Sequence, residues 1–238
     1  MTARLYGIRL SHPVLAVRGM LERKGLAYRY TELPGGMHPV VLRAAGFRSV
    51  TVPALRLADG RRVQGSLAIA RALEETVPLP SLYEAEGADA AERWGEEVLQ
   101  PIPRRIIRFG LAAHLRQRQW FAEVASPFPA AKAMGVLLTP IVPLFVRQVG
   151  ASEARVRADL LELPGHLDHV DALLADGVIG GTELGAADWQ IGTSVRMLSA
   201  FEDVGRLVAG RPAEAFGRRV VPDYPAIPAA LPPKWIPR

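Results

Sequence analysis

The spacing of apolar residues divides the first part of the chain into short strands and amphipathic helices. Residues 4–8 (RLYGI) have the composition of a strand and are too few for a helix. From Val14 to Leu21 the apolar residues recur every three or four positions, which is typical of a helix with one buried face, and Gly25 ends the run. Residues 28–33 (YRYTEL) alternate between apolar and polar side chains and predict a second strand.

The same half of the chain continues with a helix, a hairpin and another helix. A short helix is expected over 39–45, and residues 54–57 predict a third strand. The turn chemistry of Ala58-Asp59-Gly60 makes 62–64 the hairpin partner of that strand. Ser66 is interpreted as the cap of the helix that follows. The predicted order is therefore β-α-β-α-β-β-α.

Beyond the prolines at 78 and 80 the strand signal disappears and the periodicity is helical. We therefore predict a first domain over 1–78, a linker over 79–89 and an all-helical domain over 90–238. Within the helical part, Ser152 has the side chain of an N-cap, so a helix is expected from Glu153 onward.

Three segments of the second half carry expectations of their own. Pro164-Gly165 interrupts an apolar repeat and should kink or split its helix. The apolar stretch 134–146 (MGVLLTPIVPLFV) is shorter than the ~20 residues of a membrane-spanning helix and contains two prolines. We interpret it as a buried helix broken by proline, with membrane contact as the alternative. The proline-rich tail from Pro222 is expected to lie extended on the surface.

Composition narrows the possible chemistry. The chain has 238 residues, 49% of them hydrophobic, so it is long enough to bury a core without staples. It contains no cysteine, which excludes disulfides, Cys-ligated zinc, iron–sulfur clusters and a protein thiol nucleophile, and we expect no metal. No apolar leader follows Met1, so the cytoplasm is the expected location.

The net charge of +5 comes from arginines that are scattered along the chain. Nucleic-acid-binding proteins concentrate such charge in a stripe, so no nucleic-acid partner is predicted. One local cluster contains Arg104, Arg105 and Arg108 on an expected helix. Arg104 and Arg108 share a face of that helix, where they either attract an anionic co-substrate or form a solvated or salt-bridged surface.

Four segments, together with the predicted order of elements, resemble the glutathione S-transferase superfamily. They are LYGIRLSHPVLAVRGMLERKG (first strand, active-site turn and first helix), TVPAL (the cis-proline segment), VQGSLAIARALE (a helix start) and LGAADWQIG (a helix start late in the chain). The resemblance implies a fold class of α/β plus all-α. A thioredoxin-like βαβαββα domain that binds glutathione would precede a helical-bundle domain, and the protein would form a homodimer.

Ser11 matches the activating serine of the serine-type classes in this resemblance. Glutathione at pH 7 is at most a few per cent thiolate, so a transferase has to stabilise the thiolate. Lowering the thiol pKa by about two units takes roughly 2.7 kcal/mol, which a hydroxyl donor and a helix N-terminus could supply. The alternative is that Ser11, with His12 beside it, only caps the first helix.

The other site residues follow from the same resemblance. The backbone of Val52, next to an expected cis-Pro53, would pair with the cysteinyl part of glutathione. Ser66 would bind the γ-glutamyl carboxylate at a helix N-terminus, with pure capping as the alternative. His38 lies where some members place a basic residue toward the glycyl carboxylate, although a solvated loop histidine fits equally well. The residues assigned to substrate binding are His12, His38, Thr51, Val52, Pro53, Gln64, Gly65, Ser66, Arg104 and Arg108.

Two positions depart from the family pattern. Gly65 stands where an acidic residue usually holds the γ-glutamyl ammonium group, and its loss could weaken binding by ~1.5–3 kcal/mol. Gln64 is adjacent and could replace it in part, although neighbouring strand residues face opposite ways. Gly185 replaces the usual Ser or Thr before Asp188, where glycine is a tolerable cap.

The sequence thus predicts a transferase that joins glutathione, as co-substrate, to an electrophilic small molecule. The alternative is a relative without catalysis that binds a ligand or a partner, which Gly65 favours. The electrophile is not readable from the sequence because the divergent helical half would build its pocket.

Overall fold

A mixed sheet forms the centre of the N-terminal half. The computed structural model describes residues 2–34, 36–125, 136, 143, 146–147 and 149–237. Within these residues the sheet has four strands in the order β2-β1-β3-β4. Strand β1 (Ala3–Gly7) runs parallel to β2 (Tyr28–Glu32) and antiparallel to β3 (Ala54–Arg56), which pairs with β4 (Arg62–Gln64) in a hairpin. The predicted strands and their order are confirmed.

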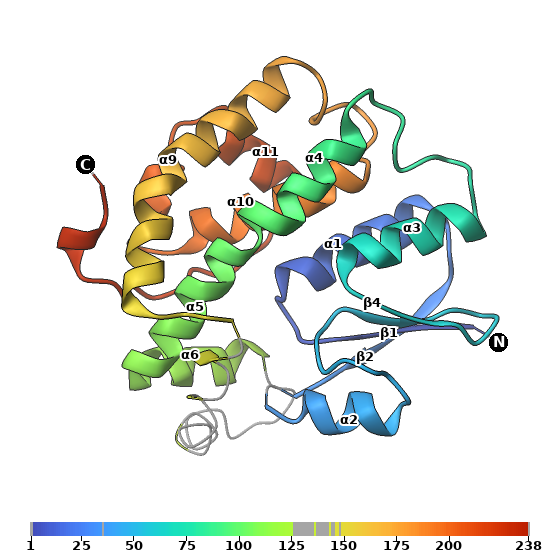
Figure 1. The fold of residues 1–238 in the computed structure, drawn as a ribbon, viewed down its shortest axis with the longest axis horizontal. Helices are drawn as coiled ribbons and strands as arrows, with labels where there is room; N and C mark the ends of the chain where they lie inside the picture. The colour runs from blue at the N-terminus through green and yellow to red at the C-terminus, as the bar shows by residue number, and fades with distance from the viewer. Residues whose placement is uncertain are drawn as a thin grey trace.

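Helices cover both faces of this sheet. Figure 1 shows α1 (His12–Arg23) and α3 (Ser66–Thr76) on one face and the short α2 (His38–Ala44) on the other. Side chains alternate along β1 because successive strand residues point to opposite faces. Leu5 packs into the cluster that α1 and α3 complete, whereas Tyr6 packs edge-on against Phe47, with ring centroids 5.4 Å apart.

The second half of the described chain is helical, as predicted. Helix α4 begins at Ala88, two residues before the expected start, and passes through a π-helical turn into α5. The elements are α4 (Ala88–Trp94), η1 (Gly95–Leu99), α5 (Pro101–Ala113), α6 (Leu115–Ala125), α9 (Glu153–Ala175), α10 (Ala186–Ala200), η3 (Gly205–Leu207), α11 (Pro212–Val220) and η4 (Pro233–Trp235).

Helix α9 passes through Pro164 without being split. Ser152 caps it as expected, its side chain accepting a 3.2 Å hydrogen bond from the N–H of Arg155. A proline inside a helix costs about 3 kcal/mol or more. Leu160, Leu163 and Leu167 are fully buried on both sides of it, and burial of each leucine side chain contributes about 1.5–3 kcal/mol. The continuous apolar face therefore outweighs the lost hydrogen bond.

Helices α1 and α10 join the two halves of the molecule through a close contact. A Cβ atom at Gly19 would lie only 2.4 Å from the indole ring of Trp189, which is too close for any side chain to fit without movement. Helix α10 is buried along most of its length. Its start is closed by Asp188, whose carboxylate accepts the N–H of Gly185 at 2.8 Å.

The tail after α11 is packed against the helical core, so the prediction of an exposed tail is wrong. Ile227 is fully buried and pairs with Phe201 through an isolated β-bridge. Arg196 of α10 donates hydrogen bonds to the carbonyl oxygens of Val221, at 2.9 Å, and Tyr224, at 3.2 Å. Proline makes the segment extended, as expected, but its apolar side chains and carbonyl groups both find partners in the core.

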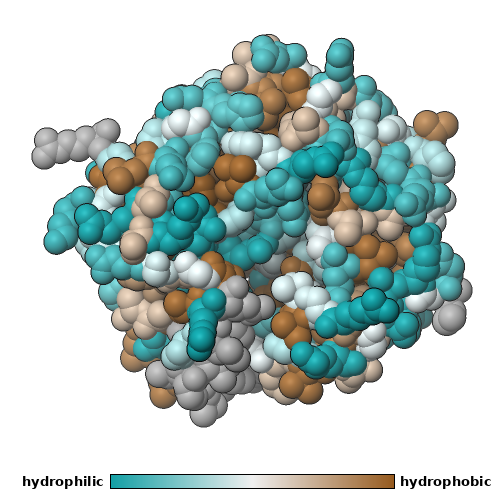
Figure 2. All heavy atoms as spheres, in the orientation of Figure 1, coloured by the Kyte–Doolittle hydropathy of each residue, from teal (hydrophilic) through white to brown (hydrophobic). Residues whose placement is uncertain are grey.

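The apolar stretch 134–146 lies almost entirely outside the described residues, so its predicted broken helix stays a prediction. Among the described helices, none is long and apolar enough to cross a membrane. On the face shown in Figure 2, the described hydrophobic residues occur in separate patches between hydrophilic ones.

Candidate functional site

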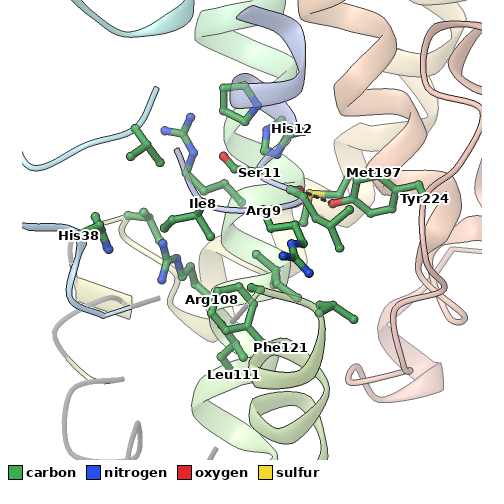
Figure 3. Close-up of a pocket in the computed structure, with 18 of the residues that line it drawn as sticks. Ile8, Arg9, Ser11, His12, His38, Arg108, Leu111, Phe121, Met197 and Tyr224 are labelled. Atoms are coloured by element: carbon green, nitrogen blue, oxygen red, sulfur yellow. Dashed lines mark hydrogen bonds between the residues drawn. The ribbon is translucent and has the colours of Figure 1, made fainter. Parts of the chain in front are cut away.

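A pocket of about 130 Å³ lies where the N-terminal half meets α5, α6 and the C-terminal tail. Figure 3 shows its walls: His38 and Arg108 lie on one side, and Met197 and Tyr224 on the opposite side. Its described lining residues are Ile8, Arg9, Leu10, Ser11, His12, Pro13, His38, Thr51, Val52, Arg104, Ile107, Arg108, Leu111, Trp120, Phe121, Val124, Ala125, Val149, Met197 and Tyr224. Seven predicted site residues are brought together here: Ser11, His12, His38, Thr51, Val52, Arg104 and Arg108.

The turn between β1 and α1 has an unusual backbone at Leu10, whose φ of 61° lies in the left-handed region. A side chain there costs roughly 1–2 kcal/mol relative to an ordinary conformation. The turn is fixed at both ends: the N–H of Ser11 donates to the carbonyl of Ile8 at 3.1 Å, and the hydroxyl of Tyr224 donates to the carbonyl of Leu10 at 2.7 Å. These contacts determine where Ser11 enters the pocket.

Ser11 occupies the N-cap position of α1, but its side chain makes no capping hydrogen bond. The capping alternative for its hydroxyl is therefore wrong. The local reason is that Pro13 has no N–H, and that the N–H of Val14 is taken by the backbone carbonyl of Ser11 at 2.9 Å. The half-buried hydroxyl lines the pocket beside the positive end of a helix, where a negative charge is favoured.

His12 is the first residue of α1 and is only 4% exposed. Burial, and then the positive charge of Arg104, lower the pKa of His12 to about 3, so the ring is neutral at pH 7. Its Nε2 atom has no hydrogen-bond partner among the described residues. The residues that the structure describes contain no cluster of three or more His, Asp or Glu side chains that could hold a metal ion.

Thr51 and Val52 form a second wall, and the Val52–Pro53 peptide bond that follows them is cis. Among the described residues, the backbone of Val52 makes no hydrogen bond. Gln64 holds this loop from behind: its amide donates to the carbonyls of Ser49, at 2.9 Å, and Thr51, at 3.2 Å. Gln64 does not line the pocket. Because its amide group is engaged by these carbonyls, it does not replace the acidic residue that the family usually has at position 65.

The start of α3 differs from the expectation. Gly65, with φ of 91°, is the N-cap, and Ser66 is the first helical residue, so Ser66 does not cap the helix. The hydroxyl of Ser66 instead donates to Glu96 at 2.7 Å, and Gln190 donates to the same carboxylate oxygen at 3.1 Å. Ser66 is 1% exposed. Pro53, Gln64, Gly65 and Ser66 are not among the lining residues, although the N–H of Gly65 bonds to the carbonyl of Pro53 at 3.0 Å.

His38 lies in the wall opposite Tyr224 and is 4% exposed, so it is not a solvated loop residue. Burial, and then the charge of Arg108, lower the pKa of His38 to about 4. The ring is neutral at pH 7 and carries no positive charge for a carboxylate. Arg108, in contrast, keeps its positive charge at pH 7, because burial and the neighbouring Arg104 lower the pKa of Arg108 only to about 10.

The three clustered arginines of α5 have different roles. Arg105 forms two hydrogen bonds, of 2.5 and 2.7 Å, to the carboxylate of Asp159, which is fully buried. Arg104 and Arg108 lie one turn apart on the face that lines the pocket. Arg104 donates to the amide oxygen of Gln100. Arg104 and Arg108 therefore lie in the pocket wall, whereas Arg105 forms the salt bridge of the cluster.

Sequence reasoning missed the part of the pocket that comes from distant segments. Trp120 and Phe121 of α6, Met197 of α10 and Tyr224 of the tail all line it. The helical spacing gave no sign of which apolar residue would face a cavity. For Tyr224, the proline-rich context pointed away from the core.

Comparison with known proteins places the fold in a family. Residues 5–81 match the family model described as glutathione S-transferase, N-terminal domain. No curated protein matches the chain significantly. Similar solved structures include a glutathione S-transferase from Rhodospirillum rubrum (20% identity, 98% of each chain covered, TM-score 0.56) and a poplar glutathione transferase (17%, 94% of each chain, 0.62). Another is a Methylobacterium radiotolerans glutathione S-transferase solved with glutathione sulfonate (22%, 98% and 97%, 0.52). Residues 5–81 thus form a domain of the glutathione S-transferase N-terminal type, and the chain as a whole shares the fold of these transferases, a thioredoxin-like sheet followed by a helical domain.

Proposed function

We propose that this protein is a serine-type glutathione transferase in which Ser11 stabilises the thiolate of bound glutathione. The observation that carries the proposal is the hydroxyl of Ser11, which lines the pocket at the start of α1 and makes no capping bond to that helix. A hydroxyl in this place can donate a hydrogen bond to a thiolate, and the helix N-terminus favours the same negative charge.

The reaction follows from that stabilisation. The thiol of glutathione loses its proton to solvent, and its sulfur attacks an electrophilic carbon of the second substrate. A carbon–sulfur bond forms while the leaving group, for example a halide, departs with its bonding electrons. Ser11 lowers the energy of the thiolate and takes no covalent part. A shift of two units in the thiol pKa corresponds to about 2.7 kcal/mol, or roughly a hundredfold more thiolate.

Glutathione would lie with its cysteinyl part along the backbone of Val52, which supports the proposal because no described group already bonds there. The γ-glutamyl end meets a modified site. Gly65 has no side chain that could bind the ligand, and the hydroxyl of Ser66 already donates a hydrogen bond to Glu96. We therefore expect glutathione to bind ten- to a hundredfold more weakly than to a site with a charge-assisted partner at position 65.

The decisive experiment compares two serines that both occupy N-cap positions. Ser11→Ala should reduce conjugation of 1-chloro-2,4-dinitrobenzene by about tenfold or more, raise the thiol pKa of bound glutathione, and leave the unfolding temperature unchanged. Ser152→Ala, which removes a real capping bond, should cost about 1 kcal/mol of stability and leave turnover unchanged. If Ser11→Ala instead destabilises the protein and keeps full turnover, the proposal is wrong.

A second function has an observation of its own in favour of it. The contact between Ser66 and Glu96 and the glycine at 65 would suit a relative that binds another ligand without catalysis. Calorimetry distinguishes the two, since no heat of binding at millimolar glutathione would eliminate the transferase. A binding protein would also bind its ligand with unchanged affinity when Ser11 is replaced by alanine.

Two further properties belong to the proposal. We expect a homodimer, which light scattering of the purified protein would test. We expect a cytoplasmic location, which fractionation of the source cells would test.

A further inference from the structure

The lining of the pocket has a one-sided charge. Its described residues include Arg9, Arg104 and Arg108 and no Asp or Glu. Arg9 is half exposed, and its charge is compensated by an ion pair with Glu32 at 3.0 Å. The charge of interest is that of the two arginines of α5.

Arg104 and Arg108 are partly buried like charges, which is a costly arrangement. Each arginine lowers the pKa of a neighbour: Arg104 that of Arg108, and Arg108 that of His38. Among the described residues, Glu96 is the acidic group that acts on Arg104, and its carboxylate already accepts hydrogen bonds from Ser66 and Gln190. A bound anion in the pocket would offset this repulsion.

Arg105 differs from Arg104 in having a carboxylate as its partner. On the same helix the chain provides Arg105 with a buried carboxylate, Asp159, in a two-bond geometry. Toward the pocket, Arg104 donates instead to the neutral amide oxygen of Gln100 and lies close enough to Arg108 to lower its pKa. Guanidinium groups match carboxylates in charge and shape.

The rest of the wall defines the body of the ligand. Ile107, Leu111, Trp120, Phe121 and Met197 line the same pocket and are apolar. Figure 3 shows Leu111 and Phe121 beside Arg108, with Met197 on the opposite side of the pocket. Such a wall favours rings or alkyl chains over polar groups.

We propose that the second ligand of this pocket is an aromatic or alkyl carboxylate, whose anionic group is held by Arg104 and Arg108 and whose body lies against α5 and α6. In calling this ligand the electrophilic substrate, the inference rests on the proposed transferase function. The binding itself does not depend on turnover.

The binding test uses two probes that differ in charge and little in shape. Calorimetry without glutathione compares naphthalene-2-carboxylate with naphthalene-2-carboxamide. The carboxylate should bind about tenfold more tightly or better, the effect of one charge-assisted hydrogen bond. Equal affinity of the two probes for the unaltered protein would overturn the proposal, and this comparison needs no variant to fold.

Variants then assign the effect to residues. In Arg104→Gln/Arg108→Gln the preference for the carboxylate should fall to about one, whereas Arg108→Lys should keep part of it because the charge remains. Arg93→Gln is the matched control, since Arg93 is exposed on α4 and pairs with Asp89 outside the pocket. A preference that survives in the double variant, or disappears in the control, contradicts the assignment.

A kinetic test separates the second substrate from glutathione, which has carboxylates of its own. Conjugation of 4-chloro-3,5-dinitrobenzoate should lose about tenfold in kcat/KM in the double variant, while its methyl ester should be unaffected. If the KM for glutathione rises instead, and that for its glycyl monoethyl ester does not, the arginines hold glutathione and the inference is wrong. If no thiol is conjugated at all, the proposed function fails while calorimetry still decides on the anion.

Discussion

The hydroxyl of Tyr224 donates a 2.7 Å hydrogen bond to the carbonyl oxygen of Leu10, the residue before the proposed catalytic serine. Leu10 has a left-handed backbone, which few residues other than glycine adopt. Tyr224 is itself fixed from behind, because Arg196 donates to its carbonyl oxygen and lies 5.8 Å from the centre of its ring. A tyrosine of the C-terminal tail thus helps to determine the position of Ser11.

Replacing this tyrosine tests its positioning role. Tyr224→Phe should cost about 1 kcal/mol of stability, the usual effect of one hydrogen bond. It should also lower kcat several-fold, with little change in the KM for glutathione, because the hydroxyl does not touch the proposed glutathione edge at Val52. Adding Leu10→Gly should restore much of the loss, since glycine adopts positive φ at no steric cost.

The measurements are chemical denaturation and steady-state kinetics on both variants. Tyr28→Phe is a suitable control, as the hydroxyl of Tyr28 accepts a bond from Arg18 at 3.3 Å outside the pocket. If Leu10→Gly fails to rescue Tyr224→Phe, the tyrosine acts by some means other than holding this turn.

A buried carboxyl group predicts how stability depends on pH. Glu92 of α4 is fully buried, and burial raises its pKa to about 7, against an opposing hydrogen bond of 2.7 Å from the hydroxyl of Tyr83. The nearby charges of Arg71, Glu96 and Asp89 have smaller effects on this pKa. The folded protein therefore holds a proton on Glu92 that the unfolded chain releases near pH 4.5.

The contribution of Glu92 is fully present below pH 4.5 and is lost as the pH rises toward 7. A shift of the pKa from 4.5 to about 7 corresponds to a loss of roughly 3 kcal/mol. Glu92→Gln cannot ionise, so its free energy of unfolding relative to the unaltered protein should increase across this window. Urea unfolding at several pH values measures the difference in free energy of unfolding between Glu92→Gln and the unaltered protein. The contributions of His12 and His38 cancel in this difference because both proteins contain them. A constant difference between pH 4.5 and 8 would contradict the prediction.

The buried ion pair between Arg105 of α5 and Asp159 of α9 is expected to contribute far more to stability than an exposed ion pair on α9. Asp159→Ala leaves the half-buried Arg105 without its carboxylate and should cost about 3–5 kcal/mol. Glu153→Ala removes an exposed 3.7 Å contact with Arg157 and should cost less than about 1 kcal/mol. Thermal unfolding of both variants checks the contrast, and similar losses would contradict it.

The fold was predictable from the sequence where local signals agree with tertiary ones, in the N-terminal half and at two helix starts of the helical half. The β3–β4 turn at Ala58-Asp59-Gly60, the cap at Ser152 and the helix start at Asp188 each carry their own chemistry. The continuity of α9 through Pro164 was not predictable, since it depends on which leucines the surrounding helices bury.

The site was predictable only where it is continuous in sequence. Ser11, His12, Thr51 and Val52 belong to motifs, and all four line the pocket. The engagement of Ser66 by Glu96 spans 30 residues and depends on how α3 meets the π-helical turn before α5, which no local pattern encodes. For the same reason the lowered pKa values of His12 and His38 follow from burial beside arginines, which only the packed structure reveals.

The bond from Tyr224 to Leu10 also bears on how the protein is made. Its two ends are 214 residues apart. During synthesis from the N-terminus, the turn at Leu10 leaves the ribosome long before the tyrosine that holds it. A nascent thioredoxin-like domain can form its sheet early, but the pocket acquires its last wall only when the tail has been translated and has folded back over α10.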